Sequence, residues 1–240
     1  MMMSSNKYIS IYNEIVEKIQ SGELKPNTKL PSENELVEEY ETSRETIRKA
    51  LMMLSQNGYI QKIRGKGSFV LNVGKFDFPI SGLVSFKEIA ERTGKPWTTI
   101  VYECDLIKPD DEVQQQLHVS GKEKVWKVLR SRKMDGERII LDKDFFNRKF
   151  VPVLTKEICE DSIYEYLEHD LHLKISFAKK EIFVDEPTEE DRRFLDLKDY
   201  NHIVVVKNSV YLEDASLFQY TESRHRLDKF KFVDFARRGH

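Results

Sequence analysis

Two arginines spaced four residues apart, Arg44 and Arg48, have the chemistry needed to read DNA bases. Residues at this spacing lie on one side of a helix, and a planar guanidinium matches O6 and N7 of guanine through two hydrogen bonds. Hydroxyl groups near helix starts bind phosphate oxygens together with free backbone amides. Candidates for such backbone contacts are Ser32, Thr42, Ser43 and Thr46.

The residues around these side chains predict the helices that carry them. Ser32 with Glu35, and Thr42 with Glu45, have the spacing of a capping box, which predicts two successive helix starts. A preceding helix is predicted from apolar residues at helical spacing. These residues are Tyr8, Ile11, Tyr12, Ile15 and Ile19. The inward face of the arginine helix is predicted to contain Ile47, Ala50, Leu51 and Leu54.

A basic hairpin is predicted over residues 59–70, directly after the third helix. Gly65 and Gly67 permit a tight reversal, and Arg64 and Lys66 place positive charge at the tip. Helix, turn, helix and basic wing in this order are typical of a module that binds in the major groove. The alternative is a small helix bundle whose arginines form a solvated face.

The distribution of charge favours DNA binding over that alternative. The whole chain has a net charge of −2. However, residues 14–41 contain eight acidic residues and three lysines, whereas residues 44–66 contain six basic residues and one glutamate. We therefore expect one positive face on the small domain, as in proteins that contact phosphates without being basic overall.

Composition limits the remaining classes. The 240 residues, 40% of them hydrophobic, are enough for one large or two modest domains. No apolar run approaches the roughly 20 residues that cross a bilayer, and the first residues lack the apolar core of a signal peptide. We expect a cytoplasmic protein without membrane contact. Cys104 and Cys159 lack metal-ligand spacing and are expected to be reduced thiols, and neither a metal nor a cofactor is expected.

A second domain is predicted after a linker. Residues 72–79 have Gly and Pro punctuation, which separates a DNA-binding domain over 1–71 from a domain over 80–240. Asp135-Gly136 and Glu213-Asp214 are predicted hairpin turns. Strands are predicted over 125–133, 139–146, 175–185, 204–212 and 217–226, and helices over 85–91, 162–168 and 188–195. Hairpin-linked strands with intervening helices indicate an α+β fold on an antiparallel sheet.

Two of these strands carry a candidate ligand site. Arg130 and Arg132 continue an apolar face that begins with Trp126 and Val128. Buried guanidinium groups need anions, either carboxylates of the same domain or a phosphate or carboxylate ligand held by both forks. A row of polar side chains shares one face of the last strand and would suit a hydroxyl-rich ligand. The row consists of Gln219, Thr221, Ser223 and His225, although a single histidine is more often structural.

The N-terminal segment resembles the winged helix-turn-helix of the GntR family of bacterial transcription regulators. The matching segments are 25–36, 43–54, 57–60 and 64–70. The resemblance implies that Arg44 and Arg48 read guanines and that the wing tip around Gly67 enters the minor groove. Asn34 stands where the family often has an arginine, which implies an altered operator.

From Phe76 to the C-terminus the chain resembles the effector-binding domain of HutC-type GntR regulators, which shares its fold with chorismate lyase. The resemblance implies that a phosphate group is held by Ser85, Phe86, Arg130, Arg132, Ser162 and Tyr164. It implies that sugar hydroxyls are bound by Asp142, Gln219 and His225, and we place Glu222 in the same effector set.

Segments 81–88, 162–167 and 216–230 resemble in particular the regulators of trehalose operons in Gram-positive bacteria. This resemblance implies a homodimeric repressor that binds double-stranded operator DNA and is released by trehalose 6-phosphate. A regulator of the same class that senses another phosphorylated sugar, such as an amino sugar phosphate, is an alternative. An enzyme is a further alternative, but the sequence contains no nucleophile elbow, HExxH motif or Walker loop.

Overall fold

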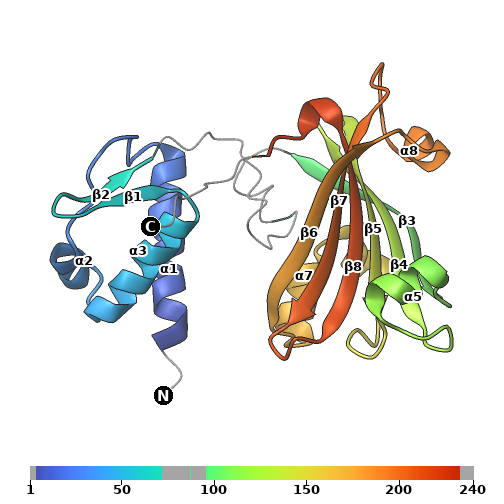
Figure 1. The fold of residues 1–240 in the computed structure, drawn as a ribbon, viewed down its shortest axis with the longest axis horizontal. Coiled ribbons are helices and arrows are strands. Elements are labelled where there is room, and N and C mark those ends of the chain that lie inside the picture. The colour runs from blue at the N-terminus through green and yellow to red at the C-terminus, as the bar shows by residue number, and fades with distance from the viewer. Residues whose placement is uncertain (1–3, 72–86, 88–95, 233–240) are drawn as a thin grey trace. The chain divides into compact units, whose positions relative to one another are not determined.

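The computed structural model describes residues 4–71, 87 and 96–232 of the chain, which divides into two compact units (Figure 1). The N-terminal unit consists of three helices and a hairpin. The helices are α1 (Ser4–Ser21), α2 (Glu33–Glu39) and α3 (Arg44–Gln56). The hairpin pairs β1 (Ile60–Ile63) with β2 (Gly67–Val70) in antiparallel register. This is the predicted order of helix, helix, helix and wing.

Apolar periodicity explains how these helices pack. Ile11, Ile15 and Ile19 of α1 are buried in one core cluster with the apolar face of α3, which confirms both predicted stripes. The capping box at the start of α2 is also confirmed. The amide of Glu35 donates to Oγ of Ser32 over 3.3 Å, and the amide of Ser32 donates to Oε2 of Glu35 over 2.7 Å.

The predicted capping box of Thr42 with Glu45 is wrong by one residue. Helix α3 begins at Arg44, and its N-cap is Ser43, whose Oγ accepts a hydrogen bond of 3.2 Å from the amide of Thr46. Glu41 adopts a left-handed conformation with φ of 43°. We attribute the shift to this extra turn residue, which brings the serine, a better cap than threonine, to the helix start.

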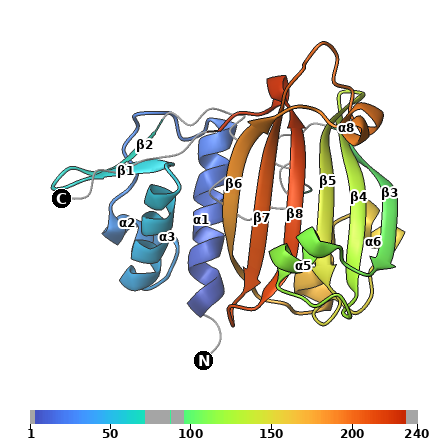
Figure 2. The same cartoon turned by 45° about the vertical axis from the view of Figure 1, so that its right-hand side comes forward.

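The C-terminal unit is built on a six-stranded antiparallel sheet, in the order β3-β4-β5-β8-β7-β6 (Figure 2). The strands are β3 (Trp97–Ile107), β4 (Val125–Met134), β5 (Glu137–Asn147), β6 (Ile175–Asp185), β7 (Ile203–Leu212) and β8 (Leu217–Arg226). Helices α5 (Asp111–Leu117) and α8 (Glu189–Phe194) lie on one face. Helices α6 (Lys156–Glu160) and α7 (Ile163–Glu165) lie on the other, and a π-helical turn continues α7.

Most predicted elements of this unit are present. Asp135 and Gly136 have φ angles of 51° and 86°, so the predicted tight hairpin turn is confirmed. The second hairpin loop is longer than predicted, because the amide of Leu212 donates to the carbonyl of Ser216 across it. Strand β3 and helices α5 and α6 were not predicted. The predicted helix over 85–91 falls largely, and the predicted linker entirely, outside the described residues, so the domain limits stay a prediction.

Two further features concern the described residues only. None of their helices has both the length and the apolar character to span a bilayer. Their two cysteines are free thiols, as predicted, but Sγ of Cys104 lies 3.6 Å from Sγ of Cys159. The sheet thus brings together two thiols that are distant in the sequence.

Candidate DNA-binding and effector sites

The exposed side of α3 carries the two arginines predicted to read bases. Their side chains are 60% and 59% exposed, and both are held by one carboxylate. Nε of Arg44 donates to Oε2 of Glu33 over 3.2 Å, and Nε of Arg48 donates to the same atom over 2.9 Å. The terminal Nη atoms have no protein acceptor among the described residues. The two guanidinium groups are therefore fixed at one end and open at the other.

The helix starts next to these arginines provide exposed cap residues. Ser32 and Ser43 are exposed N-caps of α2 and α3, as phosphate contact requires. Thr42 is half-buried just before α3. Thr46 is buried, and its hydroxyl lies 2.8 Å from Oγ of Ser43. The role of Thr46 in the structure is thus in the cap rather than at the exposed surface.

The turn of the wing contains two glycines with backbone angles that favour glycine. Gly65 and Gly67 have φ angles of 74° and 107°, which L-residues rarely adopt. Arg64, Lys66 and Gly67 are all exposed there. A β-carbon at Gly67 would lie 2.8 Å from Cε of Lys29, so the glycine also makes room for a third cation. Lys29 belongs to the acidic segment of residues 14–41, and its position beside the wing comes from a bridge to β2 that sequence spacing does not reveal.

The predicted effector residues lie on the sheet face covered by α6 and α7, called the inner face below. The strand register places Arg130 opposite Asp142, and Asp142 opposite Ser223. Two residues further along the strands, Arg132 is opposite Ile140, and Ile140 is opposite His225. Because side chains two residues apart share a face, the structure brings together five predicted residues. They are Arg130, Arg132, Asp142, Gln219 and His225, all buried.

Both inner-face arginines form ion pairs with aspartates. Nη2 of Arg130 lies 2.6 Å from Oδ2 of Asp144, and Nε of Arg132 lies 2.8 Å from Oδ2 of Asp142. Each of these four residues is less than a tenth exposed. Of the two alternatives considered for the arginines, the structure contains the salt bridges. However, Nε of Arg130 is buried without a hydrogen-bond partner among the described residues, so this group keeps a donor for a further anion.

Asp144 is the acceptor that connects this site, and sequence reasoning missed it. Besides Arg130, it accepts hydrogen bonds from Nε2 of Gln219 over 3.0 Å and from Oγ1 of Thr221 over 2.8 Å. Oε1 of Gln219 in turn accepts from the hydroxyl of Tyr164 over 3.0 Å. Alternation along the strand that contains Asp142 would have placed Asp144 on the same face.

Helices α6 and α7 are attached to this network. The carbonyl of Cys159 in α6 accepts a 3.1 Å hydrogen bond from Nη1 of Arg130. Ser162 is the N-cap of α7, and its Oγ accepts from the amide of Glu165 over 3.2 Å. Burial raises the pKa of Tyr164 and keeps its hydroxyl protonated as a donor. Ser85 and Phe86, predicted to hold the phosphate, lie outside the described residues.

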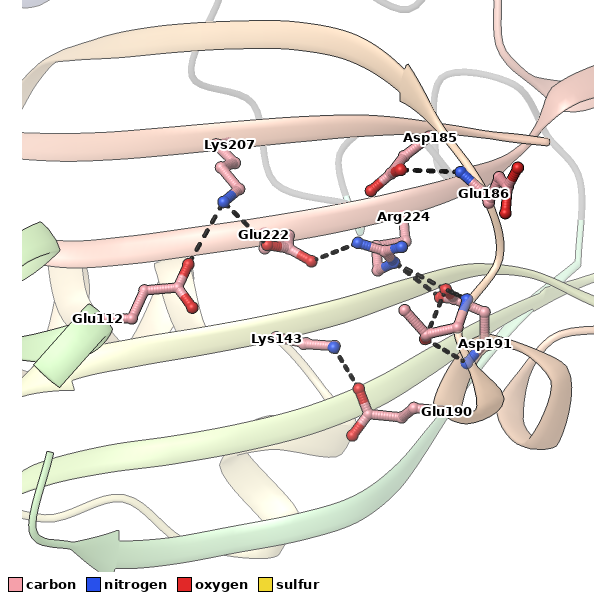
Figure 3. Close-up of polar contacts among 10 residues, drawn as sticks. Glu112, Lys143, Asp185, Glu186, Glu190, Asp191, Lys207, Glu222 and Arg224 are labelled. Atoms are coloured by element: carbon pink, nitrogen blue, oxygen red, sulfur yellow. Dashed lines mark hydrogen bonds and ion pairs between the residues drawn. The ribbon is translucent and has the colours of Figure 1, made fainter. Parts of the chain in front are cut away.

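The prediction that Glu222 contacts the effector is wrong. Glu222 has the opposite parity to Gln219 and His225 in β8, so its side chain points to the other face of the sheet. There it accepts a 2.7 Å hydrogen bond from Nη1 of Arg224 and lies 3.5 Å from Nζ of Lys207 (Figure 3). Arg224 is held at its Nε by Asp191, at the start of α8. Glu222 therefore belongs to a structural ion network.

Family models match nearly the whole chain. Residues 7–70 match the model for bacterial regulatory proteins of the gntR family, and residues 92–231 match the UTRA domain. The chain belongs to the GntR family. It is a DNA-binding transcription regulator with a C-terminal UTRA domain, not an enzyme, which confirms the predicted family and fold class.

Individual relatives support the assignment over the full length. The HTH-type transcriptional regulator TreR of Bacillus subtilis is 61% identical over 99% of this chain and 100% of its own length. The repressor MngR of Escherichia coli, of a mannosyl-D-glycerate transport and metabolism system, is 31% identical over 96% of each chain. The structure of B. subtilis YydK covers 96% of this chain and 99% of its own, with a TM-score of 0.80 and 28% identity. The effector-binding domain of the B. subtilis trehalose repressor covers 60% of this chain and 99% of its own, with a TM-score of 0.56 and 61% identity.

The surroundings at the inner face of this GntR regulator shift the pKa values of Asp142 and His225. Burial alone would raise the pKa of Asp142, but the guanidinium groups of Arg132 and Arg130 hold it below its ordinary value. Burial lowers the pKa of His225 to about 4, although Asp142 acts in the opposite direction. At neutral pH the site therefore contains an ionised aspartate and a neutral histidine.

Replacing Glu33 by glutamine should reduce the discrimination between operator and random DNA. The neutral amide cannot hold both Nε atoms by charge-assisted bonds, so the arginine forks lose their fixed orientation. We expect the ratio of operator affinity to random-sequence affinity to fall about tenfold, within the range of one bidentate base contact. Fluorescence anisotropy with both DNAs at one salt concentration measures this ratio.

Glu45→Gln is the matched control, because it removes the same charge from the same unit but pairs with Lys49 instead. It should change both affinities by a similar factor and leave their ratio unaltered. An unchanged ratio for Glu33→Gln, or an equal fall for both variants, would show that Glu33 does not orient the arginines.

The buried histidine should make folding sensitive to acid. The folded state binds fewer protons than the unfolded state between pH 6.5 and about 4, so stability is lost as the pH falls through this window. The loss of unfolding free energy caused by His225 reaches about 3 kcal/mol below pH 4, and about 2 kcal/mol of it falls between pH 7 and pH 5. Urea unfolding at pH 7 and pH 5 should show a smaller loss for His225→Gln than for the wild type. Equal losses would mean that His225 does not titrate as described.

Proposed function

We propose that this regulator represses genes for trehalose use and that trehalose 6-phosphate, bound at the inner face, releases it from its operator. One observation carries the effector class: two buried guanidinium groups lie on one sheet face beside carboxylate, amide and hydroxyl groups. Guanidinium groups bind phosphate, and carboxylate, amide and hydroxyl groups bind sugar hydroxyls. The 61% identity to TreR over the whole chain supports the choice of sugar.

The ion pairs provide a way for the ligand to bind without leaving charges unpaired. The phosphate would approach Nε of Arg130 and the guanidinium of Arg132, in competition with the aspartates. The released oxygens of Asp142 and Asp144 would then accept hydrogen bonds from sugar hydroxyls. This exchange keeps every buried charge in contact with a partner, which matters because an unpaired buried charge costs about 3–5 kcal/mol.

The same exchange would move the helices on the inner face. Arg130 donates to the carbonyl of Cys159 in α6, and Gln219 accepts from Tyr164 in α7. A ligand that draws Arg130 and Gln219 toward itself must stretch or remake both contacts. The ligand would then favour one arrangement of α6 and α7 over the other. A free-energy difference of about 1–3 kcal/mol between them would be enough, since this is an ordinary coupling between two sites.

The proposal predicts that trehalose 6-phosphate weakens operator binding. The double variant Arg130→Gln/Asp144→Asn removes an arginine together with its carboxylate, so no buried charge is left unpaired. We expect its affinity for trehalose 6-phosphate, measured by calorimetry, to fall at least about a hundredfold, the effect of about 3 kcal/mol of charge-assisted hydrogen bonding. Wild-type protein that neither binds this sugar phosphate nor releases operator DNA with it would overturn the proposed effector.

We further propose a homodimer formed through β6. This strand ends the sheet, and an unpaired edge is a template for pairing with another chain. Four of its large apolar side chains are exposed: Phe177, Ile182, Phe183 and Val184. Strand β3, at the other edge, contributes none to the exposed large apolar residues in the described part of the chain. A two-fold dimer would present two DNA-binding units to two operator half-sites.

Val184→Lys should weaken this dimer, because it places a charge on the apolar part of the edge. Val153→Lys is the control, since the two valines are 59% and 53% exposed and Val153 lies outside the sheet. Analytical ultracentrifugation should show a dissociation constant raised at least about tenfold for Val184→Lys alone, the cost of about 1.4 kcal/mol of lost apolar contact. A fully dimeric Val184→Lys protein would exclude this edge as the interface.

A further inference from the structure

We infer that Lys180 of β6 and Asn208 of β7 bind the sugar ring of the effector that does not carry the phosphate. The inference deepens the proposed function, because it needs a phosphorylated disaccharide at the inner face. It assigns a separate subsite for the second ring, with a cationic amine and an amide as its polar groups.

The strand register places both residues on the inner face, in line with the site already described. Lys180 is opposite Asn208, Asn208 is opposite Thr221, and Thr221 is opposite Asp144. Cross-strand partners point to the same side of a sheet. A continuous polar row therefore runs from Asp144 in the centre of the sheet to Lys180 at its β6 edge.

Asn208 has an unmet hydrogen-bonding requirement. Its Oδ1 is buried and has no donor among the described residues. A buried acceptor without a partner is destabilising, so native structures rarely keep one without a reason. The residues before and after it on this face are Val206 and Val210, which offer no donor. A ligand hydroxyl would satisfy this oxygen.

Lys180 adds a donor beside Asn208. It is half-buried between Ala178 and Ile182 on the same strand face, and burial lowers the pKa of its amine. A polar hydroxyl ligand suits such an amine, since it supplies hydrogen-bond acceptors without needing to be charged. Together the amide oxygen accepts and the ammonium group donates, which matches the two capacities of sugar hydroxyls.

Strand spacing explains why only a disaccharide would reach this pair. Neighbouring strands lie about 4.8 Å apart. The arginines lie on β4, and the carboxylates and Gln219 lie on β5 and β8, one and two spacings away. If the phosphate is held at β4, the first hexose ring lies over β5 and β8. The second ring then lies over β7 and within reach of β6, where Asn208 and Lys180 are found.

The experiment compares two ligands that differ by one ring. Calorimetry with trehalose 6-phosphate and with glucose 6-phosphate is performed on the full chain as wild type, Asn208→Ala and Lys180→Met. We expect each variant to lose about tenfold or more in affinity for trehalose 6-phosphate, the worth of about one hydrogen bond to a buried or charged group. The affinity for glucose 6-phosphate should stay within about twofold of the wild type, since no contact to it is removed.

Two neighbours provide matched controls. Lys179→Met removes a lysine next to Lys180 that pairs with Glu181, and Ser209→Ala alters β7 next to Asn208. Both residues point to the opposite face by alternation, so neither variant should affect either ligand. Thermal unfolding of all four variants checks that each is folded.

The outcomes separate the subsite from the proposed effector. Unchanged affinity of Asn208→Ala and Lys180→Met for trehalose 6-phosphate, or an equal loss for both ligands, would overturn the subsite and leave the effector assignment standing. Wild-type protein that does not bind trehalose 6-phosphate would overturn both. Selective loss of the disaccharide phosphate in the two variants, with normal controls, would establish the second-ring site.

Discussion

Two buried guanidinium–carboxylate pairs on one sheet face are the interaction on which the C-terminal unit depends. Arg130 with Asp144 and Arg132 with Asp142 place four charges at positions that are less than a tenth exposed to water. Such charges are tolerated only when each is paired and its remaining hydrogen bonds are satisfied. The surrounding structure supplies an amide and a hydroxyl on β8 and a carbonyl in α6, and only Nε of Arg130 stays without a partner among the described residues. The geometry of the site is therefore dictated by charge compensation.

The N-terminal unit uses the same chemical groups for a different purpose. Glu33 also holds two arginines, but these are about 60% exposed, so their pairing with it contributes little to stability. Its effect is geometric, because one oxygen anchors both Nε atoms and leaves the terminal nitrogens facing solvent. DNA phosphates and bases can then be contacted without breaking the anchor. Burial thus decides whether a guanidinium–carboxylate contact holds a fold together or orients exposed side chains.

Local patterns predicted what depends on a few adjacent residues. The cap of α2, the arginine helix, the Asp135-Gly136 turn and the face shared by Arg130 and Arg132 follow from spacing alone. What the sequence could not supply was register, which sets the cross-strand partners of Asp144 and Asn208. Glu222 shows the reverse case: strand alternation starting from Gln219 would have excluded it from the effector site. Strand β3 mixes threonine, acidic and apolar residues, and its position at the sheet edge explains the weak pattern.

The charge balance of the inner face also bears on which anions can act as effectors. Two arginines and two aspartates sum to zero, so an incoming phosphate adds negative charge that the four residues do not neutralise. Inorganic phosphate would separate both carboxylates from their arginines and leave them only neutral donors, namely Ser223 for Asp142, and Gln219 and Thr221 for Asp144, at a cost of several kcal/mol. A sugar phosphate brings hydroxyl donors for the displaced oxygens, and Lys180, on the same face, adds a positive charge. If the proposed effector is correct, the balanced site would therefore favour an anion attached to a sugar over a bare anion, which is the selectivity that a sensor of sugar phosphates needs.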